Sequence, residues 1–201
     1  MARVRRPYKI IVWGPGVLGR ALLREIVAKP ELDLVGVLAY NSQKHGKDVG
    51  EGIASLGVKA TTNKEEIFRL DADVVLHCVQ NSSDVSIDSE VTNDVVRLLE
   101  SGKNVICSIA YHWPQFHSRA FEEKLQAACR KGGVTLHSTG INPGFLNERL
   151  VATLTAVCTK IDYIKVQEIS DTSTIESADM MSAIGYGKKP ADNLMVVSLG
   201  D

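Results

Sequence analysis

Residues 8–19 read YKIIVWGPGVLG, an apolar run that leads directly into the glycine pattern GxGxxG. The run predicts a buried parallel strand, and the helical spacing of Leu18, Leu22 and Ile26 predicts a helix over residues 17–28. In such a unit the first glycine allows a tight turn, the second lets a pyrophosphate approach the backbone, and the third permits close packing. The helix N-terminus would present free N–H groups to the anion. We therefore predict a dinucleotide-binding loop rather than a mere tight turn, formed by Gly14, Pro15, Gly16, Val17, Leu18 and Gly19.

Strand and helix patterns alternate through the following hundred or so residues. Strands are expected over residues 32–39, 58–61, 73–79, 104–107 and 134–137, and helices over 47–54, 64–70, 89–101 and 115–131. This alternation predicts an α/β fold, a doubly wound parallel sheet of the Rossmann type, over residues 1–140. His77, within the strand over 73–79, is expected to be a hydrogen-bonded core histidine.

Residues 141–201 predict the start of a second domain. A helix is expected over residues 145–157, a strand over 161–169 and a helix over 175–184. One strand and two helices cannot bury their own faces, and the strand edges would stay unpaired. We therefore expect an α+β substrate and oligomerisation domain that is incomplete here or completed by another copy. A homo-oligomer, a dimer or more, is the expected assembly.

Composition narrows the classes of partner and compartment. The chain has 201 residues, a net charge of -1 and 44% hydrophobic residues, so charge gives no reason to expect nucleic acid. No apolar run has the length of a membrane span, and no signal peptide precedes the first strand. The four cysteines form no CxxC pair, and the histidines share no metal-like spacing with acids. We expect a cytoplasmic protein with a small-molecule substrate and no metal site.

The segment after the second predicted strand bears on the choice of cofactor. An NAD site usually has Asp or Glu about 20 residues past the fingerprint, bonded to the ribose 2′-hydroxyl. Here residues 38–45 read LAYNSQKH, without a carboxylate. Amide, hydroxyl and cationic groups suit a 2′-phosphate, so we predict NADP, with NAD possible, and Asn41, Ser42 and Lys44 as phosphate contacts. A solvated polar loop that accepts either cofactor is the alternative.

Several segments carry a family resemblance. Residues 12–20 (VWGPGVLGR), 34–37 (LVGV) and 46–51 (GKDVGE) resemble the N-terminal domain of dihydrodipicolinate reductases. With residues 102–106 (GKNVI) and 140–145 (GINPGF), the set is similar to the subgroup of 2,4-diaminopentanoate dehydrogenase and the native amine dehydrogenases, whose members are considerably longer. The resemblance implies NAD(P)H-dependent hydride transfer to or from a C=N or C=O carbon of a small amine, imine or carbonyl substrate.

The same resemblance implies where the nicotinamide lies, because ligands of open α/β sheets bind at the carboxyl ends of strands. The cofactor contacts expected there are Cys78, Val79, Ser108 and Asn142. The cysteine could instead be a core residue, and Asn142 could cap a helix. Glu148 is expected on a solvated helix face.

Proton transfer needs a group near the reacting carbon. The amine dehydrogenase-like members have an acidic residue soon after the fifth strand, but residues 108–114 read SIAYHWP here. By position, His112 and Tyr111 are the catalytic candidates, because imidazole titrates near neutral pH. His112 could instead pack the loop. The missing carboxylate also favours an alternative function, a non-catalytic NADP(H)-binding sensor or scaffold. A sugar-type oxidoreductase is disfavoured because no Glu-Lys-Pro motif follows residues 102–106.

Overall fold

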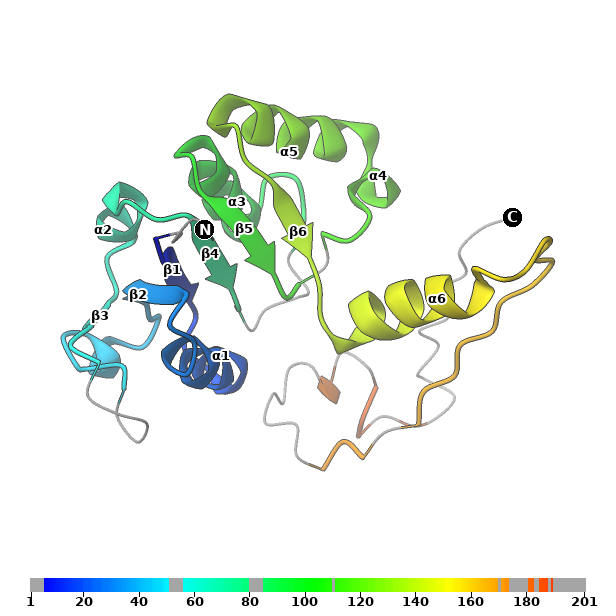
Figure 1. The fold of residues 1–201 in the computed structure, drawn as a ribbon, viewed down its shortest axis with the longest axis horizontal. Coiled ribbons are helices and arrows are strands. Elements are labelled where there is room, and N and C mark those ends of the chain that lie inside the picture. Colours follow the sequence, from blue (N-terminus) through cyan, green and yellow to red (C-terminus); the bar gives the residue numbers. More distant parts are fainter. Residues whose placement is uncertain are drawn as a thin grey trace, which may run out of the picture. The chain divides into compact units, whose positions relative to one another are not determined.

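The computed structural model describes residues 6–50, 56–79, 85–109, 111–169, 171–173, 181–182, 185–187 and 189. Its centre is a six-stranded sheet in the order β3-β2-β1-β4-β5-β6, in which all pairs are parallel (Figure 1). The strands are β1 Tyr8–Trp13, β2 Leu32–Leu38, β3 Ala60–Thr61, β4 Val74–His77, β5 Asn104–Cys107 and β6 Leu136–Ser138. The predicted Rossmann-type sheet is confirmed. Its order reverses between β1 and β4, the place where such sheets bind ligands.

Helices cover both faces of this sheet. α1 (Val17–Val27) lies on one face, while α2 (Lys64–Arg69), α3 (Glu90–Glu100) and α5 (Arg119–Gly132) lie on the other (Figure 1). Successive side chains of β1 alternate between the two layers, as the period of a strand requires. Val12 packs with Leu23 of α1, whereas Trp13 belongs to the cluster formed with α3 and α5. Burying each such side chain contributes roughly 1.5–3 kcal/mol.

Two predicted helices differ in the structure. Residues 47–50 are not helical, and the rest of the helix expected over 47–54 lies outside the described residues. The Asp48 carboxylate accepts hydrogen bonds from backbone N–H groups, including that of Gly50, and this competes with a helical ladder. The helix expected over 115–131 is broken into α4 (Pro114–His117) and α5. Ser118 is extended at the break, and its hydroxyl caps α5 by accepting from the Phe121 N–H at 3.1 Å.

The segment after β6 begins as predicted and then departs from prediction. The π-helical η2 (Ile141–Leu150) and α6 (Val151–Thr155) follow β6 and match the helix expected from residue 145. The 3₁₀ helix η1 (Ser42–Lys44) lies earlier in the chain. The strand predicted over residues 161–169 is wrong, since all nine are exposed and none is in a strand. Among the described residues no strand pairs with this segment, so its backbone has no ladder to join. Most of the helix expected over 175–184 lies outside the described residues.

By their contacts, the residues divide into two compact units, Met1–Ile161 and Asp162–Asp201. The helix after β6 therefore groups with the Rossmann-type unit. The functional domain boundary expected at residue 140 and the homo-oligomer both stay predictions.

His77, at the end of β4, is a buried imidazole in an apolar setting. Its side chain is fully buried, with Nδ1 3.3 Å from Cys107 Sγ and the ring centroid 5.8 Å from that of Trp13. Within the described part of the chain, Nε2 has no hydrogen-bond partner, so the expected satisfied histidine is only partly satisfied. Burial, with a smaller contribution from the Lys64 charge, lowers the pKa of His77 to about 3.

This buried imidazole predicts acid sensitivity. The unfolded chain binds a proton here below about pH 6.5 and the folded chain only near pH 3, so the free energy of unfolding falls as pH falls through this window. Between pH 7 and pH 5 the expected loss from this group is about 2 kcal/mol. Urea unfolding of the wild type and His77→Gln at both pH values measures it. The variant should lose that share of the pH dependence, and His117→Gln, at an exposed histidine, should retain it. Equal pH dependence in wild type and His77→Gln would contradict the prediction.

Candidate functional site

The glycine loop has the shape that its pattern predicts. Gly14 has a φ of +96°, and a Cβ there would lie 2.5 Å from the carbonyl oxygen of Cys78. A Cβ on Gly19 would clash with the carbonyl oxygen of Gly14, so both positions exclude a side chain. At Gly16, by contrast, a Cβ would meet nothing within 4 Å. The loop therefore packs tightly on the β1–β4 boundary and leaves open space above its second glycine, where a pyrophosphate fits.

The N-terminus of α1 borders that open space. Gly16 is the N-cap and has no side chain to bond the first-turn N–H groups, and no acidic residue occupies that turn. Val17 and Leu18 are 71% and 49% exposed, whereas Leu23 and Ile26 further along the helix are buried. An uncapped helix start with a positive dipole end favours an anion. The residues present fit the phosphates of a dinucleotide.

At the end of β2, an aromatic residue stands where NAD sites usually have a carboxylate. Ala39 is buried, and the Tyr40 hydroxyl accepts a hydrogen bond of 2.9 Å from the indole N–H of Trp13. The ammonium of Lys64 lies 5.9 Å from the Tyr40 ring centroid and pairs with Asp94 of α3 at 2.5 Å. Burial raises the pKa of the Tyr40 hydroxyl, which keeps it neutral. Residues 38–45, all of which the structure describes, offer no carboxylate for a ribose 2′-hydroxyl.

A cavity of about 400 Å³ lies beside the glycine loop and is mainly cationic. Its lining includes Arg20 of α1, Lys44 and Lys47. The Lys44 ammonium also donates to the carbonyl oxygen of Pro15 at 3.0 Å. Among the lining residues that the structure describes, the one acid is Asp48, which accepts N–H bonds of 2.8, 3.2 and 2.8 Å from Gly50, Leu56 and Gly57. The carboxylate is thus bonded to backbone N–H groups but keeps its negative charge, and the three cations outnumber it among these lining residues.

The predicted phosphate contacts divide accordingly. Lys44 lines the cavity, but Asn41 and Ser42 are not among its lining residues. The Asn41 side-chain oxygen instead accepts from the Gln43 N–H at 2.9 Å and starts η1. The cavity lining also includes Arg20 and Lys47, which the sequence analysis did not name as phosphate contacts. Their signals were present, since Arg20 directly follows GxGxxG and Lys47 lies within the GKDVGE segment.

The expected nicotinamide contacts after β4 and β5 lie at one edge of the sheet. Cys78 N donates to the Trp13 carbonyl at 2.8 Å, and Ser108 N donates to the His77 carbonyl at 3.1 Å. These bonds continue the parallel ladders past the strand ends, so that Cys78 lies beside Gly14 and Ser108 lies beside the end of β4. Val79 follows and is half-buried. Burial raises the pKa of the Cys78 thiol to about 11, so the thiol is neutral near pH 7.

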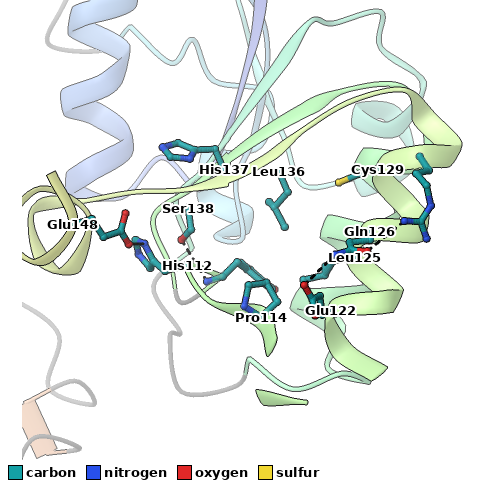
Figure 2. Close-up of a pocket in the computed structure, with 12 residues that line it drawn as sticks. His112, Pro114, Glu122, Leu125, Gln126, Cys129, Leu136, His137, Ser138 and Glu148 are labelled. Atoms are coloured by element: carbon teal, nitrogen blue, oxygen red, sulfur yellow. Dashed lines mark hydrogen bonds and ion pairs between the residues drawn. The ribbon is translucent and has the colours of Figure 1, made fainter. Parts of the chain in front are cut away.

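The two predicted catalytic side chains have different surroundings. Tyr111 is buried, its hydroxyl lies 3.1 Å from the Thr92 hydroxyl of α3, and its ring stacks on Phe121. His112 is in contact with Glu148 instead, at 2.9 Å between Nδ1 and Oε1. Both residues line a cavity of about 450 Å³ with Ser138 (Figure 2). Glu148 is exposed, as expected for a solvated helix face, and its carboxylate also contacts His112.

Asn142 begins the turn into the helix after β6. It is exposed and extended, with φ −128° and ψ 124°, as expected before a proline. Its side-chain oxygen accepts from the Asn147 amide at 3.3 Å. Its predicted contact with nicotinamide or substrate stays a prediction.

The described residues contain neither a membrane-spanning helix nor a cluster of metal ligands. None of their helices is long and apolar enough to cross a membrane. No group of three or more His, Cys, Asp or Glu side chains among them is arranged to hold a metal ion.

Comparison with known proteins places this geometry in a family. The family described as "Dihydrodipicolinate reductase, N-terminus" matches residues 8–108. The chain is 34% identical over 186 residues to amine dehydrogenase of Streptomyces virginiae, covering 89% of this chain and 50% of that protein. It is 24% identical over 184 residues to 2,4-diaminopentanoate dehydrogenase of Acetoanaerobium sticklandii, covering 86% and 49%. The chain thus spans about half the length of these curated relatives.

A solved structure agrees with the same fold. Amine dehydrogenase from Mycobacterium smegmatis superposes with a TM-score of 0.67 at 21% identity, over 77% of this chain and 45% of that one. The resemblance inferred from residues 12–20, 34–37 and 46–51 is confirmed, since all three segments fall within the matched range. From its glycine loop, its strand order and this match, the chain belongs to the dihydrodipicolinate reductase N-terminal family.

Proposed function

We propose that this chain is the cofactor-binding part of an NAD(P)-dependent dehydrogenase that transfers hydride to or from the C=N or C=O carbon of a small amine, imine or carbonyl compound. The observation that carries the proposal is the open space above Gly16 at the uncapped start of α1, on the strand-order reversal of the sheet. The names of two relatives, amine dehydrogenase and 2,4-diaminopentanoate dehydrogenase, support a nitrogen-bearing substrate.

In this proposal each part of the site has one task. The loop Gly14–Gly19 binds the pyrophosphate, and Cys78, Val79, Ser108 and Asn142 border the nicotinamide. When bound, the nicotinamide supplies the hydride donor or acceptor. His112 takes the proton from the substrate nitrogen during amine oxidation and returns it during reduction. The Tyr111 hydroxyl, bonded to Thr92 in the core, shapes the loop and does not transfer the proton.

We further propose that NADP(H) is preferred over NAD(H). Arg20, Lys44 and Lys47 border one cavity beside the fingerprint, and the acid in its lining is already bonded to backbone N–H groups. A 2′-phosphate placed there would form charge-assisted bonds, each about twice as strong as a neutral one. Tyr40 at the end of β2 supplies no carboxylate to bind a free 2′-hydroxyl.

Cofactor titration followed by tryptophan fluorescence tests this preference. We expect saturable binding that is tighter for NADPH than for NADH. Arg20→Ala and Lys47→Ala should each weaken NADPH binding about tenfold, a loss of about 1.4 kcal/mol, and leave NADH binding nearly unchanged. Lys29→Ala is the matched control, because Lys29 lies past the far end of α1 and pairs with Glu25. Tighter binding of NADH would overturn the preference, and no binding of either cofactor would overturn the function.

Substitution of His112 tests the proposed proton transfer. His112→Asn should reduce turnover with amine or imine substrates about 100-fold, the scale of general acid–base catalysis, and leave the NADPH dissociation constant within twofold. His117→Asn, at an exposed histidine that packs on Phe121, should retain turnover. Unchanged turnover in His112→Asn would remove this residue from the mechanism.

The second candidate function is a non-catalytic NADP(H)-binding sensor or scaffold. It is favoured by one observation, the absence of a carboxylate from residues 108–114. Saturable NADPH binding without turnover on any primary amine, on ketone with ammonia or on aldehyde would select this function over the dehydrogenase.

A further inference from the structure

We infer that Glu148 is a positioning residue for His112: its carboxylate accepts the Nδ1–H bond and leaves Nε2 as the nitrogen able to accept a proton. The catalytic consequence of this inference rests on the proposed dehydrogenase function. The pairing of His112 with Glu148 does not depend on that function. In this chain a carboxylate near the loop after β5 comes from a different segment, the helix after β6.

The sheet brings these two distant residues together. His112 and Glu148 are 36 positions apart, one in the loop after β5 and the other in η2 after β6. β5 and β6 are parallel neighbours, so both connections leave from the same edge. Thr139 N donates to the Cys107 carbonyl at 2.9 Å and extends this pairing past the strand ends.

Tight local packing fixes both segments. The Ser138 hydroxyl donates to the Ile109 carbonyl and lies 3.4 Å from the Tyr111 N–H, which ties the loop before His112 to β6. On the other side, a Cβ on Gly144 would lie 3.1 Å from the Thr139 backbone and hydroxyl, so η2 approaches the end of β6 closely. The pair is therefore held by main-chain geometry as well as by its own hydrogen bond.

Burial and donor chemistry decide which ring nitrogen carries the proton. The His112 side chain is 13% exposed and that of Glu148 is 47% exposed, so the imidazole is shielded while the carboxylate reaches water. An ionised carboxylate can only accept, so the bond at 2.9 Å requires a proton on Nδ1. In neutral imidazole Nε2 then carries the lone pair. A base whose orientation is set by a third group is the usual arrangement for proton abstraction.

Both residues border the cavity of about 450 Å³, together with Ser138, His137 and Arg130 (Figure 2). In Figure 2 the Glu148 carboxylate reaches from the helix towards the His112 ring, and α5 forms the opposite wall of the cavity. A small substrate that entered here would meet the imidazole and not the tyrosine hydroxyl, which is bonded to Thr92.

NMR spectroscopy can show directly which ring nitrogen of His112 carries the proton. In protein labelled with ¹⁵N-histidine, a two-bond ¹H–¹⁵N correlation above the titration range of imidazole distinguishes Nδ1–H from Nε2–H rings, and His112→Asn assigns the signal. We expect the Nδ1–H tautomer in the wild type. Glu148→Gln fits the same space and keeps an amide oxygen that can accept from Nδ1–H, so it should retain this tautomer. Glu148→Leu removes the acceptor and should shift His112 towards Nε2–H. Glu123→Leu, at an exposed glutamate of α5 that pairs with Arg119, should not.

Turnover and binding then separate this inference from the proposed function. Glu148→Leu should lower kcat at least tenfold, with the NADPH dissociation constant unchanged. A wild-type Nε2–H tautomer, or an Nδ1–H tautomer that persists in folded Glu148→Leu, would overturn the inference. The wild-type tautomer decides it even if Glu148→Leu folds poorly. The expected tautomer shift combined with full turnover in His112→Asn would instead overturn the catalytic role and leave the pairing intact.

Discussion

The close approach of Gly14 to the Cys78 carbonyl oxygen is the contact on which the site depends. A Cβ on Gly14 would lie only 2.5 Å from that oxygen, so no residue larger than glycine fits. Glycine therefore allows the chain to turn sharply after β1, at the place where the strand order reverses. The turn positions the start of α1 over the edge of the sheet and places the end of β4 beside the loop. The proposed pyrophosphate and nicotinamide sites therefore both depend on Gly14 having no side chain.

Much of the fold could be predicted because its signals are local. Two patterns predict the sheet: the glycine pattern after a buried strand, and the β-branched residues at the start of Val74–His77. Residues 161–169 have an equally good strand pattern, yet no strand among the described residues pairs with them. A strand needs a partner, and pattern alone does not supply one. The helix predicted from residue 47 is wrong over residues 47–50 because of a local hydrogen bond. The Asp48 carboxylate accepts from the Gly50 N–H, which competes with a helical ladder.

The candidate site was predictable only in part for a related reason. Position along the chain identified His112, since it follows a strand end at the expected edge. Its partner Glu148 depends on how β5 and β6 are aligned and on how closely Gly144 lets the next helix approach, and neither is a property of the residues around Glu148. Beside the glycine loop, Arg20 and Lys47 come from separate segments and line one cavity. Their proximity can be seen only in the folded chain.

The buried ends of β4 and β5 have a consequence for how this protein responds to pH. Burial sets the pKa of His77 to about 3, that of Cys78 to about 11 and that of Cys107 to about 12. Near neutral pH all three side chains are uncharged, so this buried cluster does not change its charge there. In the proposed dehydrogenase, a change of reaction rate with pH near neutrality would therefore have to come from groups other than these three.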